Sequence, residues 1–297
     1  WPKGDLRELC GRTVRFKIGF QKTPESAPHL YALYLRSAAK RSTGVASASA
    51  TEFSVTVGKR SVNARLLSPA PERLAADPAL LLTFAMDRRL SISITPYCLT
   101  TEYFLAQGHR VVSFDLPMHG ERVDTYGSDI VGMRNAFVAG KEVFAEFVEE
   151  GKAVIDECIR RGWAKPGRIA VAGTSRGGYM ALRLMAGDER IAAGAGFAPV
   201  TDWALLKEFA EDRERADVQA LRLANFAPQM AGRHVYLAIG NKDERVGTQS
   251  CKQLAEQLAA TDPQCVEFHL TEDEGHSLND SWYGVGRESL LKWVQAL

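Results

Sequence analysis

Residues 173–178 constrain the fold of this chain more than any other segment, because they must join a strand directly to a helix. They follow an apolar run at 168–172 and precede a helix-like run at 179–185. A side chain at the tip of such a turn, here Ser175, needs a strained backbone, and the glycines two residues before and after it relieve the steric collision. The Ser175 hydroxyl would then stand clear of the sheet, near the positive end of the following helix.

An acid and a base follow this serine in the order that nucleophilic chemistry requires. Asp243 comes directly after an apolar strand pattern at 234–239, and His276 follows an alternating strand pattern at 266–270 and an acidic loop. A nucleophilic serine needs a base, and that base needs an acid that fixes its tautomer and stabilises the imidazolium. The sequence therefore predicts Ser175, Asp243 and His276 as catalytic residues.

The strand and helix patterns predict an α/β fold. Residues 53–57 and 62–67 alternate in polarity on either side of a glycine turn, which is typical of an antiparallel hairpin. Later strands are short and almost continuously apolar, as parallel strands covered on both faces are: 80–84, 110–114, 169–172 and 235–239. Amphipathic helical stretches, among them 142–155 and 287–296, separate or follow them.

With this order of residues, each after its own strand, the chain resembles the α/β-hydrolase family over residues 51–297. The run at 114–122 is similar to a loop of prolyl-oligopeptidase-like and dienelactone-hydrolase-like esterases. The resemblance implies a mostly parallel central sheet with helices on both faces. It also implies a small lid insertion at about 202–233 and a serine esterase that needs no cofactor.

Two residues compete with the predicted triad. Asp202 follows the sixth predicted strand, where some hydrolases place their acid, but Asp243 lies in the more typical sequence context. His119 lies in the loop similar to that of the esterases, and we expect it to anchor the loop by hydrogen bonding because His276 already stands where the family keeps its base.

The oxyanion hole and the substrate pocket are predicted from the same resemblance. One oxyanion amide would be that of Arg176, after the nucleophile, and the other would come from the turn after the third strand, where we favour Met86 over Ala85. Trp203 and Phe209 of the insertion would line the substrate pocket. The alternative is that they only dock the insertion on the core.

Length and composition agree with one principal domain. A chain of 297 residues with 45% apolar content can bury one large core. Residues 1–50 would form a β-rich extension with strands at 12–20 and 29–36 and a linker at 42–50. Since the chain begins with tryptophan and shows no signal peptide, we expect a truncated or processed product, either cytoplasmic or secreted after processing.

Charge and cysteine content argue against several kinds of partner. A net charge of +1, from 37 basic and 36 acidic residues, gives no reason to expect nucleic acid, and no apolar run predicts a membrane span. Five cysteines without metal-ligand spacing predict no metal site. A bridge between Cys251 and Cys265 is the alternative to scattered thiols.

The sequence thus predicts a carboxylesterase that cleaves short acyl esters of small molecules, with acetyl esters of sugars among the candidates. Its oligomeric state stays open, and a homo-oligomer is one alternative. Two other functions also stay open, namely an oligopeptidase-like serine peptidase and a catalytically silent binding protein on the same fold.

Overall fold

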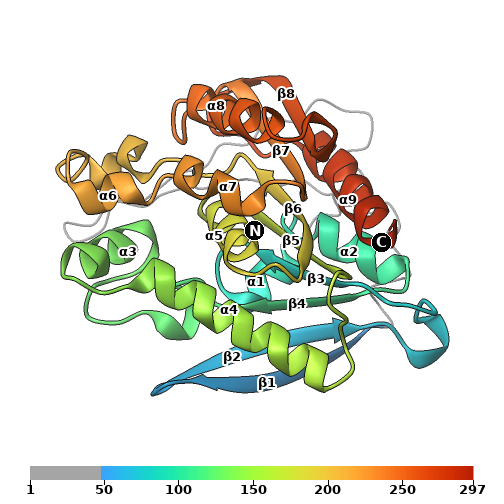
Figure 1. Ribbon diagram of the computed structural model, residues 1–297. Coiled ribbons are helices and arrows are strands. Elements are labelled where there is room, and N and C mark those ends of the chain that lie inside the picture. The colour runs from blue at the N-terminus through green and yellow to red at the C-terminus, as the bar shows by residue number, and fades with distance from the viewer. Residues whose placement is uncertain (1–47, 297) are drawn as a thin grey trace, which may run out of the picture. The chain divides into compact units, whose positions relative to one another are not determined.

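An eight-stranded sheet with the order β1-β2-β4-β3-β5-β6-β7-β8 lies at the centre of residues 48–296, the part of the chain that this computed structural model describes (Figure 1). The strands predicted at 12–20 and 29–36 lie outside the described residues.

The first two strands form the predicted antiparallel hairpin. β1 (Ser49–Val57) pairs with β2 (Arg60–Ser68), and Gly58 adopts a φ of +60° in the turn between them. β1 begins four residues before the predicted start, so the last residues of the predicted linker belong to this strand.

The remaining strands form the predicted parallel part of the sheet, and β2 joins it by antiparallel pairing with β4. These strands are β3 (Leu80–Phe84), β4 (Arg110–Phe114), β5 (Ile169–Thr174), β6 (Ile191–Phe197), β7 (His234–Lys242) and β8 (Val266–Glu274). All neighbouring pairs from β3 and β4 to β8 are parallel. Every residue of β3, β5 and β6 is buried, which explains their apolar runs.

Helices cover both faces of this sheet. In Figure 1, α2 (Leu99–Ala106) and α9 (Asp280–Gln295) lie side by side on one face, while α4 (Val143–Arg160) and α5 (Arg176–Gly187) lie on the other. The other α-helices are α1 (Arg88–Ser93), α3 (Asp129–Val138), α6 (Ala216–Ala220), α7 (Ala227–Met230) and α8 (Thr248–Ala259).

Aromatic side chains pack these helices against the strands. Phe147 of α4 stacks on Phe114 of β4 with ring centroids 4.7 Å apart. On the other face, Tyr283 of α9 stacks on Phe197 of β6 at 4.3 Å. Such pairs bury large apolar areas on both faces, so the sheet is held in a fixed position between its helices.

The segment predicted as an insertion joins β6 to β7 and consists of short helical turns. They are the 3-10 turns η5 (Trp203–Leu205), η6 (Lys207–Phe209) and η7 (Leu223–Phe226), together with α6 and α7.

The predicted bounds of β8 and α9 also differ from the structure. β8 continues to Glu274, because residues of the predicted acidic loop still pair with β7. α9 begins at Asp280 rather than at residue 287, because the Asn279 side chain accepts a hydrogen bond from the Ser281 amide and so caps the helix. Two glycines in its first half hide the helical pattern from the sequence.

No helix within residues 48–296 combines the length and the apolar character that a membrane crossing requires.

Candidate active site

Ser175 lies at the turn between β5 and α5 with a φ of +54° and a ψ of −120°. A residue with a side chain adopts this conformation at a cost of about 1–3 kcal/mol, and only where its surroundings hold it there. Here the Ser175 amide donates to the Phe197 carbonyl at 2.9 Å, and its carbonyl accepts from the Val200 amide at 3.0 Å. The neighbouring strand β6 and the loop after it therefore fix the turn.

The glycines around Ser175 are required by close packing. A Cβ atom on Gly173 would lie 2.1 Å from the Gly177 carbonyl oxygen, and one on Gly177 would lie 2.2 Å from the Phe84 carbonyl oxygen. Neither backbone could move aside without disrupting the sheet or the helix. The strand, turn and helix predicted from residues 173–178 are confirmed, and the glycines serve the purpose expected of them.

Asp243 and His276 meet beyond the ends of β7 and β8. His276 Nδ1 lies 2.7 Å from Asp243 Oδ2. The other carboxylate oxygen, Oδ1, accepts from the amides of Arg245 at 3.0 Å and Val246 at 3.2 Å. Asp243 is only 2% exposed, so these contacts hold one oxygen toward the imidazole. A carboxylate on Nδ1 leaves His276 Nε2 as the nitrogen that can accept a proton.

Ser175, Asp243 and His276 all follow carboxyl ends of parallel strands, so they lie at one edge of the sheet. Within the described residues the Ser175 hydroxyl makes no hydrogen bond to His276. Such contacts are often long before substrate binds. The structure thus joins two of the three predicted residues directly and places the third at the same edge.

Asp202, the rival acid, is engaged elsewhere. Its Oδ1 accepts from the Ala204 amide at 2.9 Å and so caps η5, and its Oδ2 pairs with Arg222 Nε at 2.7 Å. Both partners belong to the insertion. Asp202 therefore fixes the insertion, and the geometry favours Asp243 as the partner of His276.

In the turn after β3, where an oxyanion donor is predicted, both candidate amides have a partner in α1. The amides of Ala85 and Met86 both donate to the Ser91 hydroxyl, at 2.9 Å and 3.1 Å. Ser91 is fully buried in α1, where its hydroxyl also donates to the Asp87 carbonyl. The Met86 amide is thus already bonded, and it can serve an oxyanion only by sharing or releasing this contact.

Trp203 and Phe209 are both fully buried. Their rings lie 5.5 Å apart, and Trp203 also packs against Phe144 at 4.9 Å and against Tyr179 at 5.1 Å. Side chains enclosed in this way hold the insertion on α4 and α5. Their placement supports the docking alternative rather than the predicted contact with substrate.

His119 anchors its loop by hydrogen bonding, as expected. Its Nδ1 lies 2.8 Å from the Pro117 carbonyl oxygen, and its Nε2 lies 2.8 Å from Nε of Arg176 and 2.9 Å from Oδ1 of Asp129. Arg176 Nη2 also pairs with Asp129 Oδ1 at 2.8 Å. Contacts with His119 and Arg176 hold the pKa of Asp129 below its usual range.

The same loop is tied to α1 through a buried ion pair. Asp115 accepts from the Arg88 amide at 2.7 Å and from Arg88 Nη1 at 2.9 Å, and both side chains are almost fully buried. Asp115 also accepts from the Glu121 amide at 3.0 Å. The charged residues of the esterase-like loop therefore fix its shape.

Sequence reasoning missed three residues of this region: Ser91, Tyr97 and Asp129. Burial raises the pKa of Tyr97, and the nearby charge of Arg176 opposes that rise. No periodic pattern links α1, α3 and the loop between α1 and α2 to the turn after β5. Only the fold brings them together.

The described cysteines are unbridged. Cys98, Cys158, Cys251 and Cys265 are free thiols, so the bridge between Cys251 and Cys265 is not formed. Burial raises the pKa of the Cys158 thiol to about 12, which makes it unreactive at neutral pH. In residues 48–296 no three His, Cys, Asp or Glu side chains come together as a metal site would require.

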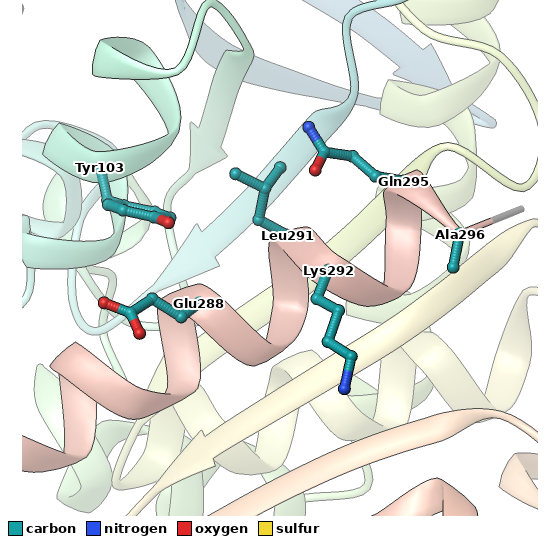
Figure 2. Close-up of a pocket in the computed structure, with 6 residues that line it drawn as sticks. All are labelled: Tyr103, Glu288, Leu291, Lys292, Gln295 and Ala296. Atoms are coloured by element: carbon teal, nitrogen blue, oxygen red, sulfur yellow. The ribbon is translucent and has the colours of Figure 1, made fainter.

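A surface hollow lies between α2 and the C-terminal half of α9 (Figure 2). Its lining consists of Tyr103, Glu288, Leu291, Lys292, Gln295 and Ala296. His276 precedes the first turn of α9, and a helix rises about 1.5 Å per residue. The hollow therefore lies well away from His276 and forms no part of the site at the carboxyl ends of the strands.

Comparisons with known proteins point to one family. Residues 123–297 match the prolyl oligopeptidase family. A curated relative, the probable dipeptidyl-aminopeptidase B of Metarhizium robertsii, is 21% identical over 184 residues. These make up 58% of this chain but only 20% of the relative.

Two solved structures show the fold. A cold-adapted esterase from an Arctic intertidal metagenomic library is 22% identical, with a TM-score of 0.63, over 83% of this chain and 94% of the esterase. A puromycin hydrolase is 19% identical, with a TM-score of 0.60, over 84% of this chain and 39% of that protein. Such likenesses show a shared α/β-hydrolase fold.

Proposed function

This chain belongs to the prolyl oligopeptidase family, and we propose that it is a serine hydrolase that cleaves short-acyl carboxylic esters through an acyl-enzyme on Ser175. The observation that carries the proposal is the 2.7 Å contact between Asp243 and His276, at the same sheet edge as the strained Ser175. A buried carboxylate on the Nδ1 atom of a histidine is the arrangement that makes the other nitrogen a base.

Acylation begins at the Ser175 hydroxyl. His276 Nε2 takes its proton while the oxygen attacks the ester carbonyl carbon, and Asp243 stabilises the imidazolium that forms. The negative oxygen of the tetrahedral intermediate accepts a hydrogen bond from the Arg176 amide, with the Met86 amide as the proposed second donor. His276 then gives its proton to the alcohol oxygen, and the alcohol leaves.

Deacylation repeats these steps with water. His276 removes a proton from a water molecule, whose oxygen attacks the acyl carbonyl of the Ser175 ester. The second tetrahedral intermediate collapses, the proton returns to Ser175, and the carboxylic acid leaves. The two half-reactions together use the side chains and amides of this chain, and one water molecule is consumed, in deacylation.

The proposal of short acyl groups rests on the insertion between β6 and β7. Its helical turns are short, and its large aromatic residues Trp203 and Phe209 are used for packing against the core. A pocket of limited size gains about 0.8 kcal/mol per buried methylene only until it is full. The small-molecule substrate proposed here is therefore an ester of a short acid, and acetyl esters of sugars are one candidate class.

A peptidase is the second candidate, and the family match favours it. The curated relative carries the name of a dipeptidyl-aminopeptidase, but this chain spans only a fifth of its length. Peptide and ester hydrolysis share the same nucleophile and base, so the triad alone does not separate them. A comparison of ester and peptide substrates is therefore needed to separate the two activities.

A panel of p-nitrophenyl esters from acetyl to lauroyl, together with aminoacyl-p-nitroanilides, tests the proposal. We expect kcat/KM to be highest from acetyl to butyryl and to fall steeply by octanoyl, and we expect esters to exceed anilides. Efficiency that keeps rising to lauroyl would refute the short-acyl proposal. Anilide hydrolysis more efficient than ester hydrolysis would favour the peptidase.

A further inference from the structure

The loop after β4 contacts both backbone segments that would form the oxyanion hole. The Leu116 amide donates to the Met86 carbonyl at 3.1 Å. Three residues later, His119 Nε2 lies 2.8 Å from Nε of Arg176, the first residue of α5. The loop therefore spans from the turn after β3 to the turn after β5.

The backbone around His119 is held in an uncommon conformation. Its neighbours Met118 and Gly120 have φ angles of +60° and +55°, and Asp129, which contacts its ring, has a φ of +59°. The Asp129 amide donates to the Met118 carbonyl at 2.9 Å, so the two strained residues hold one another. Strain of this kind persists only where the surroundings enforce it, and it is concentrated at functional sites.

The contacts of His119 link the loop after β4 to the start of α5. Its Nδ1 lies 2.8 Å from the Pro117 carbonyl oxygen. Its Nε2 accepts from Arg176 Nε at 2.8 Å and also lies 2.9 Å from Asp129 Oδ1. Asp129 Oδ1 accepts from Arg176 Nη2 at 2.8 Å and balances the guanidinium charge.

We propose that His119 and Asp129 are positioning residues that act through the Arg176 side chain. By holding the Nε and Nη2 atoms of its guanidinium, they fix the first residue of α5, and with it the Arg176 amide that would stabilise the oxyanion. The Leu116 contact fixes the opposite side of the same hole. This inference rests on the proposed function, because it assumes that Ser175 forms a tetrahedral intermediate.

Two substitutions at His119 test the inference. In His119→Ala the acceptor for Arg176 is lost, and we expect kcat per titrated active site to fall about 10- to 100-fold with KM changed less than about threefold. In His119→Gln the side-chain oxygen can accept from Arg176 Nε, so we expect kcat within about fivefold of the unchanged protein. Active sites are counted from the end point of fluorophosphonate labelling.

His109 supplies a matched control. His109 lies directly before β4, whereas His119 lies after it. The His109 side chain is 1% exposed, and its Nδ1 accepts from the Ala79 amide at 3.2 Å. It therefore lies at the opposite edge of the sheet from Arg176. We expect His109→Ala to lower the melting temperature and to leave kcat unchanged.

The affinity for a boronic acid gives a second readout, because its adduct with a serine hydroxyl is tetrahedral and negatively charged. A positioning role predicts that His119→Ala weakens boronate binding by the same factor as kcat/KM. A merely structural role would lower the melting temperature and leave both values unchanged.

Unchanged kcat in folded His119→Ala would overturn the inference, as would a His119→Gln protein that is folded but as impaired as His119→Ala. If His119→Ala does not fold, Asp129→Asn replaces it, since asparagine tolerates the left-handed backbone, and kcat should fall at least about threefold. No fall in that variant would also overturn the inference.

The proposed function can fail separately. If the unchanged protein reacts with fluorophosphonate but hydrolyses no ester, the ester proposal is wrong. Boronate affinity and labelling rate then still measure whether His119 positions Arg176.

Discussion

Asp243 shows how single contacts prepare one residue for one role. Two backbone amides donate to its Oδ1, and its Oδ2 lies against the His276 ring within a buried environment. The nearby Thr248 hydroxyl accepts from the Asp243 amide at 3.1 Å, which fixes the backbone as well. The carboxylate is thus oriented before any substrate binds.

Ser175→Ala is expected to keep the fold and to remove nearly all hydrolysis. Loss of the nucleophile should lower the rate on the order of 10⁴-fold or more. Turnover of p-nitrophenyl acetate and the melting temperature measure the two effects. Hydrolysis at the original rate by a folded Ser175→Ala protein would exclude Ser175 as the nucleophile.

Asp243→Asn and Asp202→Asn form a matched pair for the identity of the acid. The first should lower kcat by orders of magnitude, because an amide does not hold the imidazole in the tautomer that accepts the serine proton. The second breaks the Arg222 ion pair in the insertion and should change kcat far less. If Asp202→Asn proved the more damaging, the acid would have to be reassigned.

The residues of the site differ in how well their positions and contacts could be predicted from the sequence. Ser175, Asp243 and His276 each follow a strand, and parallel strands bring such positions to one edge, so their grouping could be predicted. The contact between the Met86 amide and the Ser91 hydroxyl could not be predicted, because it depends on how the short helix α1 lies against the turn after β3. Asp129 and Arg176 likewise meet only through the packing of α3 near α5.

At the scale of elements, the insertion between β6 and β7 is the least predictable part of the described fold. Its aromatic residues were compatible with a pocket or with the core, and a sequence does not show which side chain faces inward. The structure places Trp203 among three aromatic neighbours. α9 shows the same limit, since its start depends on the Asn279 cap rather than on periodicity.

Trp203→Ala tests the packing role of the insertion. Removing a fully buried aromatic side chain should lower the free energy of unfolding by about 3–5 kcal/mol, with little change in KM for acetyl esters while the protein is folded. Leu205→Ala in the same turn is the control, because Leu205 is 48% exposed and its loss should change stability by less than about 0.5 kcal/mol. A large rise in KM with unchanged stability would instead place Trp203 in the substrate pocket.

The two edges of the parallel sheet hold residues with different roles. The carboxyl ends of the strands hold the strained turns, Asp243 and His276, whereas the amino ends hold buried structural contacts such as that of His109. This division follows from parallel topology and could be predicted from the strand patterns alone. It implies that substitutions at the amino ends act on stability and leave catalysis intact.

His109 makes that stability depend on pH. Burial lowers its pKa to about 4 from the ordinary value of 6.5, and the charge of Arg168 acts in the same direction. Protonation of Nδ1 would also break the hydrogen bond from the Ala79 amide. The unfolded chain therefore takes up a proton below about pH 6.5, while the folded protein resists it until about pH 4.

The stabilising effect of neutral His109 is thus complete above about pH 6.5 and is lost as the pH falls toward 4. We expect His109→Gln to lower the free energy of unfolding at pH 7 and to reduce the loss of stability between pH 7 and pH 5. Some pH dependence should remain, because burial also lowers the pKa of His234. Urea titrations of both proteins at the two pH values measure the difference, and an equal loss in both would show that His109 does not couple folding to protonation.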